Sequence, residues 1–287
     1  MKKLKIAFLD FWPEIKDENI FLLILQKYFD VEVTTLNPDV VFHSIFGGMK
    51  QTPKYKCKKI LFLGENYRPQ IFGSNYSISF DPHSTTNYRL PLWQFYLILQ
   101  PYLKDILFGP RVNHENFDRF CSFVVSNPNN FLRNGFFNMF SYQSWAYISS
   151  YGRHLTNDFS LIEASRGKYW RNAKYEFFLK YKHKYAIAFE NNSYPGYTTE
   201  KLMDAFLGNS IPIYWGDPKI KEDWNTNAFI NANKGVQYAY DLIKKQNQDI
   251  KLFDAMYHEP IFTDEQKKRH LENINGFEEW LIKICKI

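Results

Sequence analysis

The sequence predicts an α/β protein with two domains, and three observations support this prediction. Short apolar runs typical of buried strands alternate with helical segments, as in a parallel sheet covered by helices. A stretch rich in Gly, Pro, Asn and charge between Asp105 and Asp118 interrupts the alternation, which then starts again. At 287 residues the chain is long enough for two domains.

The first half of the chain alternates strands with a helix and loops. An amphipathic helix is expected to start at a cap on Asp17 and to reach Tyr28, with Phe21, Leu22 and Leu25 on its inner side. The predicted strands of this half are Leu4–Leu9, Val31–Thr34, Val40–Ile45, Lys59–Leu63 and Tyr76–Phe80.

The second half repeats the pattern and ends in a long helix. Its predicted strands are Cys121–Val125, Tyr185–Phe189, Ile211–Trp215 and Ala228–Asn231, and its other helices lie near 131–142, 168–181 and 236–245. The last helix, near 263–284, carries an apolar stripe at helical spacing, which is typical of a side that faces a core. The stripe consists of Leu271, Ile274, Phe277, Leu281 and Ile284. Basic residues before it, at 267–269, keep a membrane-surface alternative open.

Composition excludes some classes of protein. A net charge of +6 suits an anionic ligand or a membrane surface. A nucleic-acid partner is not expected, because no dense Lys/Arg run with interleaved aromatic residues is present. Aromatic residues make up 19% of the chain and can stack on sugars, although a biased coding sequence explains most of them.

Cysteine usage and hydropathy indicate the compartment. Cys57, Cys121 and Cys285 are too widely spaced for a metal motif or a disulfide framework, so a reducing cytoplasm is expected. The first apolar run, Ile6–Leu9, is too short for a signal peptide, and no run of about 18 apolar residues follows. We therefore expect a cytoplasmic protein, with peripheral contact to the cytoplasmic face of a membrane as an alternative.

The segment Phe189–Pro218 is the most informative part of the chain. It predicts a strand, a loop at Asn191–Gly196, a helix capped by Thr198 or Thr199, and a second strand. Lys201 falls in the first helical turn, where the helix dipole disfavours a cation by a few tenths of a kcal/mol. A bound phosphate would reverse that preference. A lysine that points into solvent is the other interpretation.

Polar side chains follow three of the predicted strands. They are Glu65 and Asn66; Ser126 and Asn127, with Arg133 beyond; and Glu190 and Asn191, with Glu200 and Lys201 beyond. Ligands bind at the carboxyl ends of parallel strands, where an arginine and a lysine fit a diphosphate and a carboxylate can act as a general base. Each residue also has an ordinary explanation, as a solvated carboxylate or as an arginine paired with an acid.

Several motifs are absent, and their absence narrows the chemistry. The chain has no Asp-x-Asp, which disfavours a metal-chelating sugar-nucleotide site. It also has no P-loop, no Gly-x-Gly-x-x-Gly, no His-Glu-x-x-His and no Gly-x-Ser-x-Gly. We therefore expect no required cofactor, with Mn²⁺ or Mg²⁺ acting at most as a stimulant.

The segment Phe189–Pro218 resembles the donor motif of the α-1,3/4-fucosyltransferases, glycosyltransferase family 10. That motif reads Phe-Glu-Asn-Ser, then Tyr-x-Thr-Glu-Lys, then Pro-x-x-Trp/Tyr-Gly. This chain departs from it at Asn192, Pro195 and Thr198. Further segments are similar to landmarks of the family's two domains. They are Phe120–Asn127 with Arg133 and Asn134 in the donor domain, and Asn37–Asp39, Phe46–Gly47, Phe62–Asn66 and Phe80–Asp81 in the acceptor domain.

The resemblance implies a GT-B fold, in which two Rossmann-like domains face each other across a nucleotide-sugar cleft. It implies an acceptor domain at 1–115, a donor domain at 116–262 and a C-terminal helix at 263–287 that packs back across the domains. Glu65 then matches the catalytic base. The donor-binding positions it implies are Ser126, Asn127, Arg133, Asn191, Tyr197, Glu200 and Lys201, of which Arg133 and Lys201 meet the diphosphate.

The expected function is that of a bacterial-type, inverting α-1,3-fucosyltransferase. It would move L-fucose from GDP-β-L-fucose to a Gal/GlcNAc-type glycan, of the Lewis type or in a surface polysaccharide such as lipopolysaccharide. Its partners would be GDP-fucose and an oligosaccharide or lipid-linked acceptor. Two alternatives remain: the same fold with another GDP-linked deoxysugar, or a glycan- or nucleotide-binding module without transfer activity.

Overall fold

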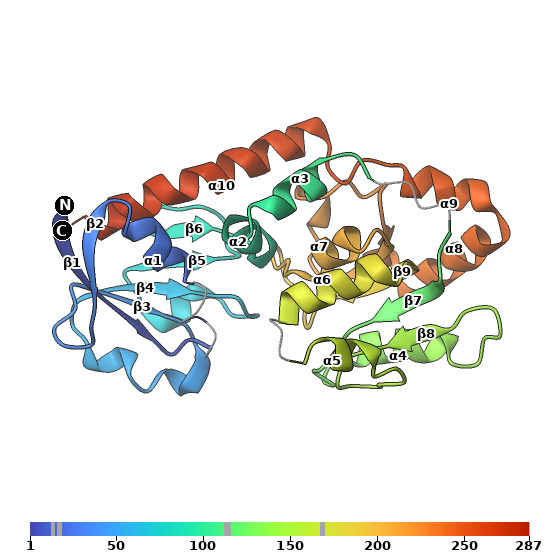
Figure 1. The fold of residues 1–287 in the computed structure, drawn as a ribbon, viewed down its shortest axis with the longest axis horizontal. Helices are drawn as coiled ribbons and strands as arrows, with labels where there is room; N and C mark the ends of the chain where they lie inside the picture. The colour runs from blue at the N-terminus through green and yellow to red at the C-terminus, as the bar shows by residue number, and fades with distance from the viewer. Residues whose placement is uncertain (13–14, 16–18, 112–115, 167–169, 287) are drawn as a thin grey trace. The chain divides into compact units, whose positions relative to one another are not determined.

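The chain folds into two compact α/β units, each built on a parallel sheet (Figure 1). The computed structural model describes residues 1–286 except 13–14, 16–18, 112–115 and 167–169. The first unit comprises Met1–Pro101 and Lys268–Ile287, and the second comprises Tyr102–Lys267. The division thus falls before the expected boundary near residue 115, because helix α3 (Tyr102–Phe108) packs against helix α7 (Lys201–Leu207) of the second unit.

The first unit contains a six-stranded sheet in the order β2-β1-β3-β4-β5-β6, and all five pairs are parallel. The strands are β1 (Lys2–Leu9), β2 (Phe29–Val33), β3 (Val40–His43), β4 (Lys58–Phe62), β5 (Tyr76–Ser79) and β6 (Asn87–Arg89). The helices are α1 (Ile20–Leu25), α2 (Leu92–Leu99) and most of α10 (Asp264–Cys285), with 3₁₀ turns at Phe46–Met49, Thr52–Lys54 and Pro69–Phe72.

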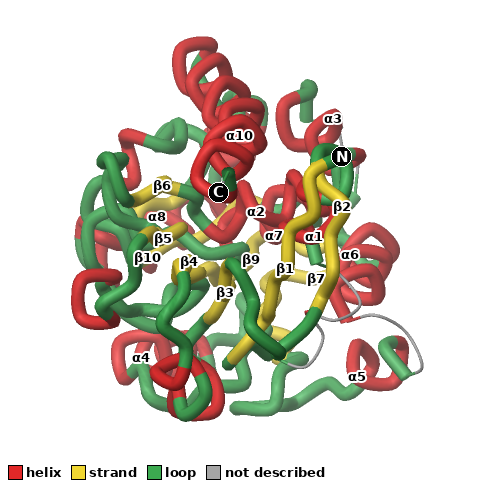
Figure 2. Tube along the Cα trace, turned by 90° about the vertical axis from the view of Figure 1, so that its left-hand side faces the viewer, coloured by secondary structure: helices red, strands yellow, loops and turns green. Residues whose placement is uncertain are grey.

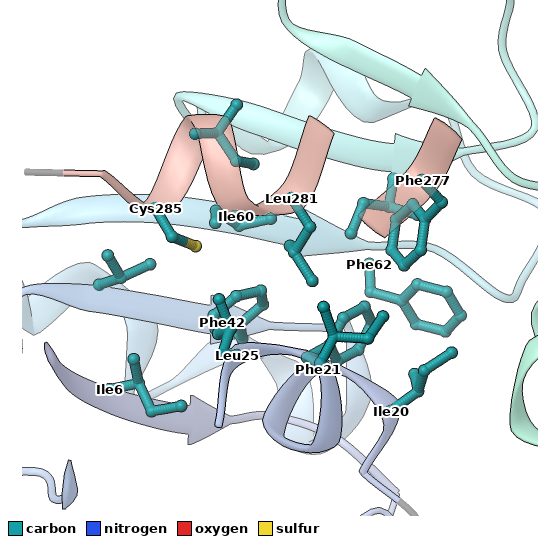
Figure 3. Close-up of a cluster of buried hydrophobic side chains, with 14 of the residues drawn as sticks. Ile6, Ile20, Phe21, Leu25, Phe42, Ile60, Phe62, Phe277, Leu281 and Cys285 are labelled. Carbon is teal, nitrogen blue, oxygen red and sulfur yellow. The ribbon is translucent and has the colours of Figure 1, made fainter. Parts of the chain in front are cut away.

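Helix α10 supplies part of the core of this unit. Phe277, Leu281 and Cys285 pack with Phe42 and Ile60 of the sheet (Figure 3). The core-facing interpretation of the apolar stripe is therefore confirmed, because its members from 274 onward are buried. In the part of the chain that the structure describes, no helix is long and apolar enough to cross a membrane.

Helix α1 is shorter than the sequence pattern indicates. Its cap is Asn19, whose side chain accepts a hydrogen bond from the backbone nitrogen of Leu22 at 3.0 Å. The expected cap, Asp17, lies outside the described residues. At the other end, Lys27 and Tyr28 leave the helix and bond to Glu278 of α10, at 2.9 and 2.8 Å.

The second unit contains a five-stranded parallel sheet in the order β11-β10-β9-β7-β8. The strands are β7 (Arg119–Phe123), β8 (Ile148–Ser150), β9 (His183–Phe189), β10 (Ile211–Trp215) and β11 (Ile230–Asn231). The helices besides α3 and α7 are α4 (Phe131–Phe140), α5 (Ser160–Ala164), α6 (Trp170–Lys180), α8 (Val236–Gln248) and α9 (Ile250–Tyr257), with 3₁₀ turns at Ile220–Glu222 and Ala232–Lys234. Figure 2 shows the strands of both sheets in yellow and the helices in red.

Candidate functional site

The order of the strands in the second unit locates its ligand site. Strands β7 and β9 are neighbours, yet the chain passes from β7 to β8 on one side of the pair and from β9 to β10 on the other. Loops that diverge in this way open a crevice at the carboxyl ends of the two strands. Ser126 and Asn127 follow β7, and Asn191 follows β9.

A cavity of about 510 Å³ lies at this point, a size suited to a small-molecule ligand. Six of the seven predicted donor-binding residues line it, and all of the lining residues belong to the second unit. The six are Ser126, Asn127, Arg133, Asn191, Glu200 and Lys201. The structure thus brings together residues that lie up to 75 positions apart in the chain (201 minus 126).

The cavity wall is cationic. Arg133, Arg153, Lys174 and Lys201 line it, and Glu200 is the only carboxylate among the lining residues that the structure describes. Positive charge in an enclosed site attracts an anionic ligand strongly, because water screens it less than at an open surface. Trp170 also lines the cavity and is 41% exposed, so its ring is accessible to a ligand.

Arg153 and Lys174 were not predicted from the sequence. Arg153 follows β8, a three-residue edge strand with two serines that lacks an apolar strand pattern. Gly152 brings this loop against the loop after β7, because a Cβ at Gly152 would lie 2.0 Å from the carbonyl oxygen of Val125. The sequence signal for Arg153 as a site residue is a glycine directly before it, just after a serine-rich segment. This signal is too weak to predict a site.

Arg133 is buried, with 1% of its surface exposed, and it connects the two strand ends. Its Nη2 donates to the carbonyl oxygen of Asn127 at 2.6 Å, and its Nη1 donates to the side-chain oxygen of Asn191 at 3.0 Å. Helix α4 starts two residues earlier, capped by Asn130, whose side chain accepts from the Arg133 nitrogen at 2.9 Å. Burial lowers the pKa of Arg133, and the Glu190 carboxylate opposes this effect.

Lys201 lies in the first turn of α7, as the sequence predicted, but it is the first residue of the helix and the cap differs. The N-cap position is Glu200 and makes no side-chain capping bond, while the Thr199 hydroxyl donates to Glu190 instead. The Lys201 ammonium lies 3.2 Å from the Glu190 carboxylate and 3.5 Å from that of Glu200. The lysine is therefore part of a buried charge network, and the solvent interpretation is wrong.

These contacts keep Lys201 and Glu200 charged, whereas burial raises the pKa of Glu190 against the opposing effect of Lys201 and Thr199. Burial alone would lower the pKa of Lys201, but Glu200 and Glu190 raise it well above its usual range. Burial would raise the pKa of Glu200, but Lys201, Arg171 and Lys174 hold it well below its usual range. Nearby, Asp204 of α7 binds Arg171 and Lys174 of α6, each at 2.7 Å, and so fixes Lys174 at the cavity wall.

Tyr197 is the predicted donor-binding residue that does not line the cavity. Its side chain is fully buried, and its ring stacks on Tyr194 with centroids 5.0 Å apart. Its contact with a donor stays a prediction.

Glu65 belongs to the first unit. It lies in the loop that follows β4, where it is half-buried. Arg68 of this loop pairs with Asp81 after β5, and Gln70 bonds to the same carboxylate at 3.1 Å. These bonds fix the loop across two neighbouring strands. The catalytic role of Glu65 stays a prediction.

No group of three His, Cys, Asp or Glu side chains suited to hold a metal ion occurs among the described residues. The charged groups of the cavity suit an anion, since the described part of its lining contains four cations and one carboxylate. A nucleoside diphosphate has both the charge and the size for this site.

Comparisons with known proteins agree with this chemistry. The family model of the alpha-(1,3)-fucosyltransferase FucT N-terminal domain matches residues 6–96. The model of the glycosyltransferase family 10 (fucosyltransferase) C-terminal region matches residues 116–259, which is 144 of the 287 residues. The chain belongs to glycosyltransferase family 10. The second match covers the cavity and the whole Phe189–Pro218 motif.

Individual family 10 members are similar over most of this chain. The alpha-(1,3)-fucosyltransferase FucT of Helicobacter pylori is 29% identical to this chain over 95% of its residues. This chain spans 63% of that relative's length. A crystal structure of an alpha1,3-fucosyltransferase matches with a TM-score of 0.72 and 25% identity, over 97% of this chain and 90% of the other. Another, with GDP, has a TM-score of 0.69 and 25% identity, over 97% and 91%.

These matches confirm the fold class, two parallel-sheet α/β units of the GT-B kind.

Proposed function

We propose that this chain is an inverting α-1,3-fucosyltransferase that moves L-fucose from GDP-β-L-fucose to a hydroxyl of a Gal/GlcNAc-type glycan. The observation that carries the proposal is a cavity lined by cations, which lies in the crevice at the carboxyl ends of β7 and β9. The chain that forms it belongs to family 10. The cavity has the charge for a diphosphate, and a solved relative is an alpha1,3-fucosyltransferase with GDP. The Helicobacter pylori relative supports the linkage.

In the proposed mechanism the acceptor hydroxyl attacks the anomeric carbon of fucose, and the bond to GDP breaks. Glu65 accepts the hydroxyl proton. Arg133 and Lys201 stabilise the charge that develops on the departing diphosphate, an interaction that strengthens in the transition state. Because two cations can supply this charge, we propose that transfer needs no metal ion, although Mn²⁺ or Mg²⁺ can stimulate it.

The test is a transfer assay with a panel of GDP-linked sugars on a glycan array, followed by NMR of the product linkage. We expect fucose transfer and an α-1,3 linkage. Transfer from a different GDP-deoxysugar alone would replace the donor in the proposal. Binding of GDP-fucose without transfer to any acceptor would favour the alternative of a non-catalytic binding module.

We further propose a bacterial cytoplasmic enzyme that builds a surface polysaccharide such as lipopolysaccharide. Cys57, Cys121 and Cys285 are unpaired thiols, as a reducing compartment requires. In α10, peripheral membrane contact would use exposed cations such as Lys268, because the apolar side of this helix is buried from Ile274 onward. Flotation with anionic and neutral vesicles tests this contact, and equal recovery with both would contradict an electrostatic attachment.

A further inference from the structure

Glu190 is a charged residue that the proposed mechanism does not use. It directly follows β9, it has no exposed surface, and it is not among the residues that line the cavity. Its Oε1 accepts from the backbone nitrogen of Thr199 at 2.7 Å, and its Oε2 accepts from the Thr199 hydroxyl at 2.6 Å. Oε2 also lies 3.2 Å from the ammonium of Lys201. Isolated buried carboxylates are costly, so these partners are needed for it to remain charged.

The surroundings leave Glu190 little freedom to move. Its backbone nitrogen donates to the carbonyl oxygen of Trp215 at 2.8 Å, and its own carbonyl oxygen accepts from the Asn130 side chain at 2.9 Å. Gly216 packs directly against the side chain, since a Cβ there would lie 2.5 Å from the Glu190 Cγ. The carboxylate is therefore a fixed point between β9, β10 and the start of α7.

Lys201 is held at this fixed point by two short contacts. Its ammonium donates to the Thr199 hydroxyl oxygen at 3.0 Å and lies 3.2 Å from Glu190. The contact with Glu200 is longer, at 3.5 Å, and both Lys201 and Glu200 line the cavity. The lysine side chain keeps 19% of its surface exposed. The two short contacts set the position of the ammonium at the cavity wall.

We propose that Glu190 is a positioning residue which, with Thr199, fixes the Lys201 ammonium at the cavity wall to meet the diphosphate of the donor nucleotide. Glu190 is not itself a proton acceptor for the reaction, because both carboxylate oxygens are occupied by Thr199 and Lys201. The inference rests on the proposed function, in which Lys201 binds that diphosphate.

The change Glu190→Gln tests the arrangement because an amide cannot satisfy it. If the amide oxygen accepts from the Thr199 backbone nitrogen, the amide NH₂ must face the Lys201 ammonium, donor against donor. If the amide is flipped, its NH₂ points at the backbone N–H of Thr199, so two donors again face each other. Lys201 therefore loses one of the two short contacts that hold its ammonium. The change adds no negative charge to the site, so a loss of GDP affinity that leaves guanosine binding unchanged reports lost positioning.

The experiment is calorimetric titration of the full chain with two probes, GDP and guanosine, which lacks phosphate. We expect Glu190→Gln to weaken GDP about ten- to a hundredfold and to leave guanosine within about twofold, the loss typical of one charge-assisted contact. Combining it with Lys201→Ala should add less than about twofold to the loss from Lys201→Ala alone. Gln246→Leu is the control for lost stability, because it removes the buried acceptor of the Tyr185 hydroxyl in the same unit and neither residue lines the cavity.

A matched pair at Thr199 keeps the test decisive if Glu190→Gln does not fold. Thr199→Val keeps the shape and removes the hydroxyl that bridges Glu190 and Lys201, without any change in charge. It should weaken GDP selectively, while Thr199→Ser should recover most of the lost affinity.

Three outcomes separate the ideas. Unchanged GDP affinity in Lys201→Ala would overturn the phosphate assignment and with it this part of the proposed function. A loss in Lys201→Ala, but unchanged GDP affinity in Glu190→Gln and Thr199→Val, would overturn the positioning role alone. If Glu190→Gln and Thr199→Val each weakened the binding of GDP and of guanosine equally, Glu190 would only support the fold.

Discussion

The carboxyl ends of the two sheets follow the same topological rule and are used in different ways. In the second unit the strand order diverges between β7 and β9, and the polar groups there line a cavity of about 510 Å³. In the first unit the strand order diverges between β1 and β3. There the Asp10 carboxylate after β1 accepts from the hydroxyl and the backbone nitrogen of Thr52, at 2.7 and 3.3 Å.

The two ends also differ in charge. Lys201, Glu190 and Glu200 form a buried ionic network in the second unit. In the first unit, Glu65 is half-buried in a loop fixed by the pair of Arg68, which is 42% exposed, and Asp81. Fixed buried charges suit a ligand that is always ionised, such as a diphosphate. A more exposed carboxylate suits a group that takes up and releases a proton.

The first prediction concerns the more exposed end and has the largest expected effect. Glu65→Gln should lower kcat about 10²- to 10⁴-fold, because the amide cannot accept the acceptor's proton. GDP affinity should stay at the wild-type value, since the GDP-binding residues proposed here all belong to the second unit. Steady-state kinetics and calorimetry measure both quantities. A variant that keeps more than about a third of the wild-type kcat would remove Glu65 from the mechanism.

The second prediction concerns the buried end. Lys201→Ala should lower turnover about 30- to 1,000-fold and also weaken GDP, because a cation is lost in the ground state and in the transition state. Lys201→Ala should therefore lower the affinity for GDP, whereas Glu65→Gln should leave it unchanged. If both variants gave the same profile, the division of roles between the two units would be wrong.

Arg133 should combine ligand binding with a structural role. Arg133→Ala should weaken GDP and also lower the free energy of unfolding by about 2–4 kcal/mol, because the carbonyl oxygen of Asn127 and the side chain of Asn191 lose a buried charged donor. Arg153→Ala, at an exposed cation of the same cavity, is the comparison in denaturant unfolding. An Arg133→Ala protein as stable as the wild type would show that the two strand ends do not depend on it.

The opposite end of the second sheet gives a pH test. Burial lowers the pKa of His183, at the start of β9, to about 4, whereas an unfolded histidine titrates near 6.5. The unfolded chain then binds more protons between these values, so the free energy of unfolding should fall by up to about 3 kcal/mol as the pH drops from about 6.5 to about 4. Urea unfolding at several pH values should show a shallower fall for His183→Gln. Parallel curves for the two proteins would contradict a neutral buried His183.

The smallest expected change is the effect of chelation. If Arg133 and Lys201 supply the positive charge at the leaving group, activity should persist after EDTA treatment and dialysis. Modest stimulation by Mn²⁺ is compatible with this view. Complete loss that Mn²⁺ restores would show that a metal ion, and not the cations of the second unit, stabilises the departing diphosphate.

Sequence patterns predicted the long apolar strands well and the short polar elements poorly. Strand β10 has the predicted bounds, Ile211–Trp215, and β9 extends the predicted run by two residues at its start. Strands β6 and β8 have three residues each and contain Asn, Arg and Ser, so no apolar run marks them. Helix α3 was missed because its second half overlaps the region interpreted as a linker, where Gly109, Pro110 and the polar residues that follow dominate the local composition.

By itself the sequence determined the α/β class, the family resemblance and six residues of the cavity, because strand ends and the Phe189–Pro218 motif are local patterns. Only the tertiary structure decided what those residues do to one another. It brought Arg153 and Lys174 to the wall, buried Glu190 and turned Thr199 from a helix cap into a bridge to Lys201. The physical reason is that burial and charge pairing depend on which strand ends become neighbours, and chain spacing does not encode this.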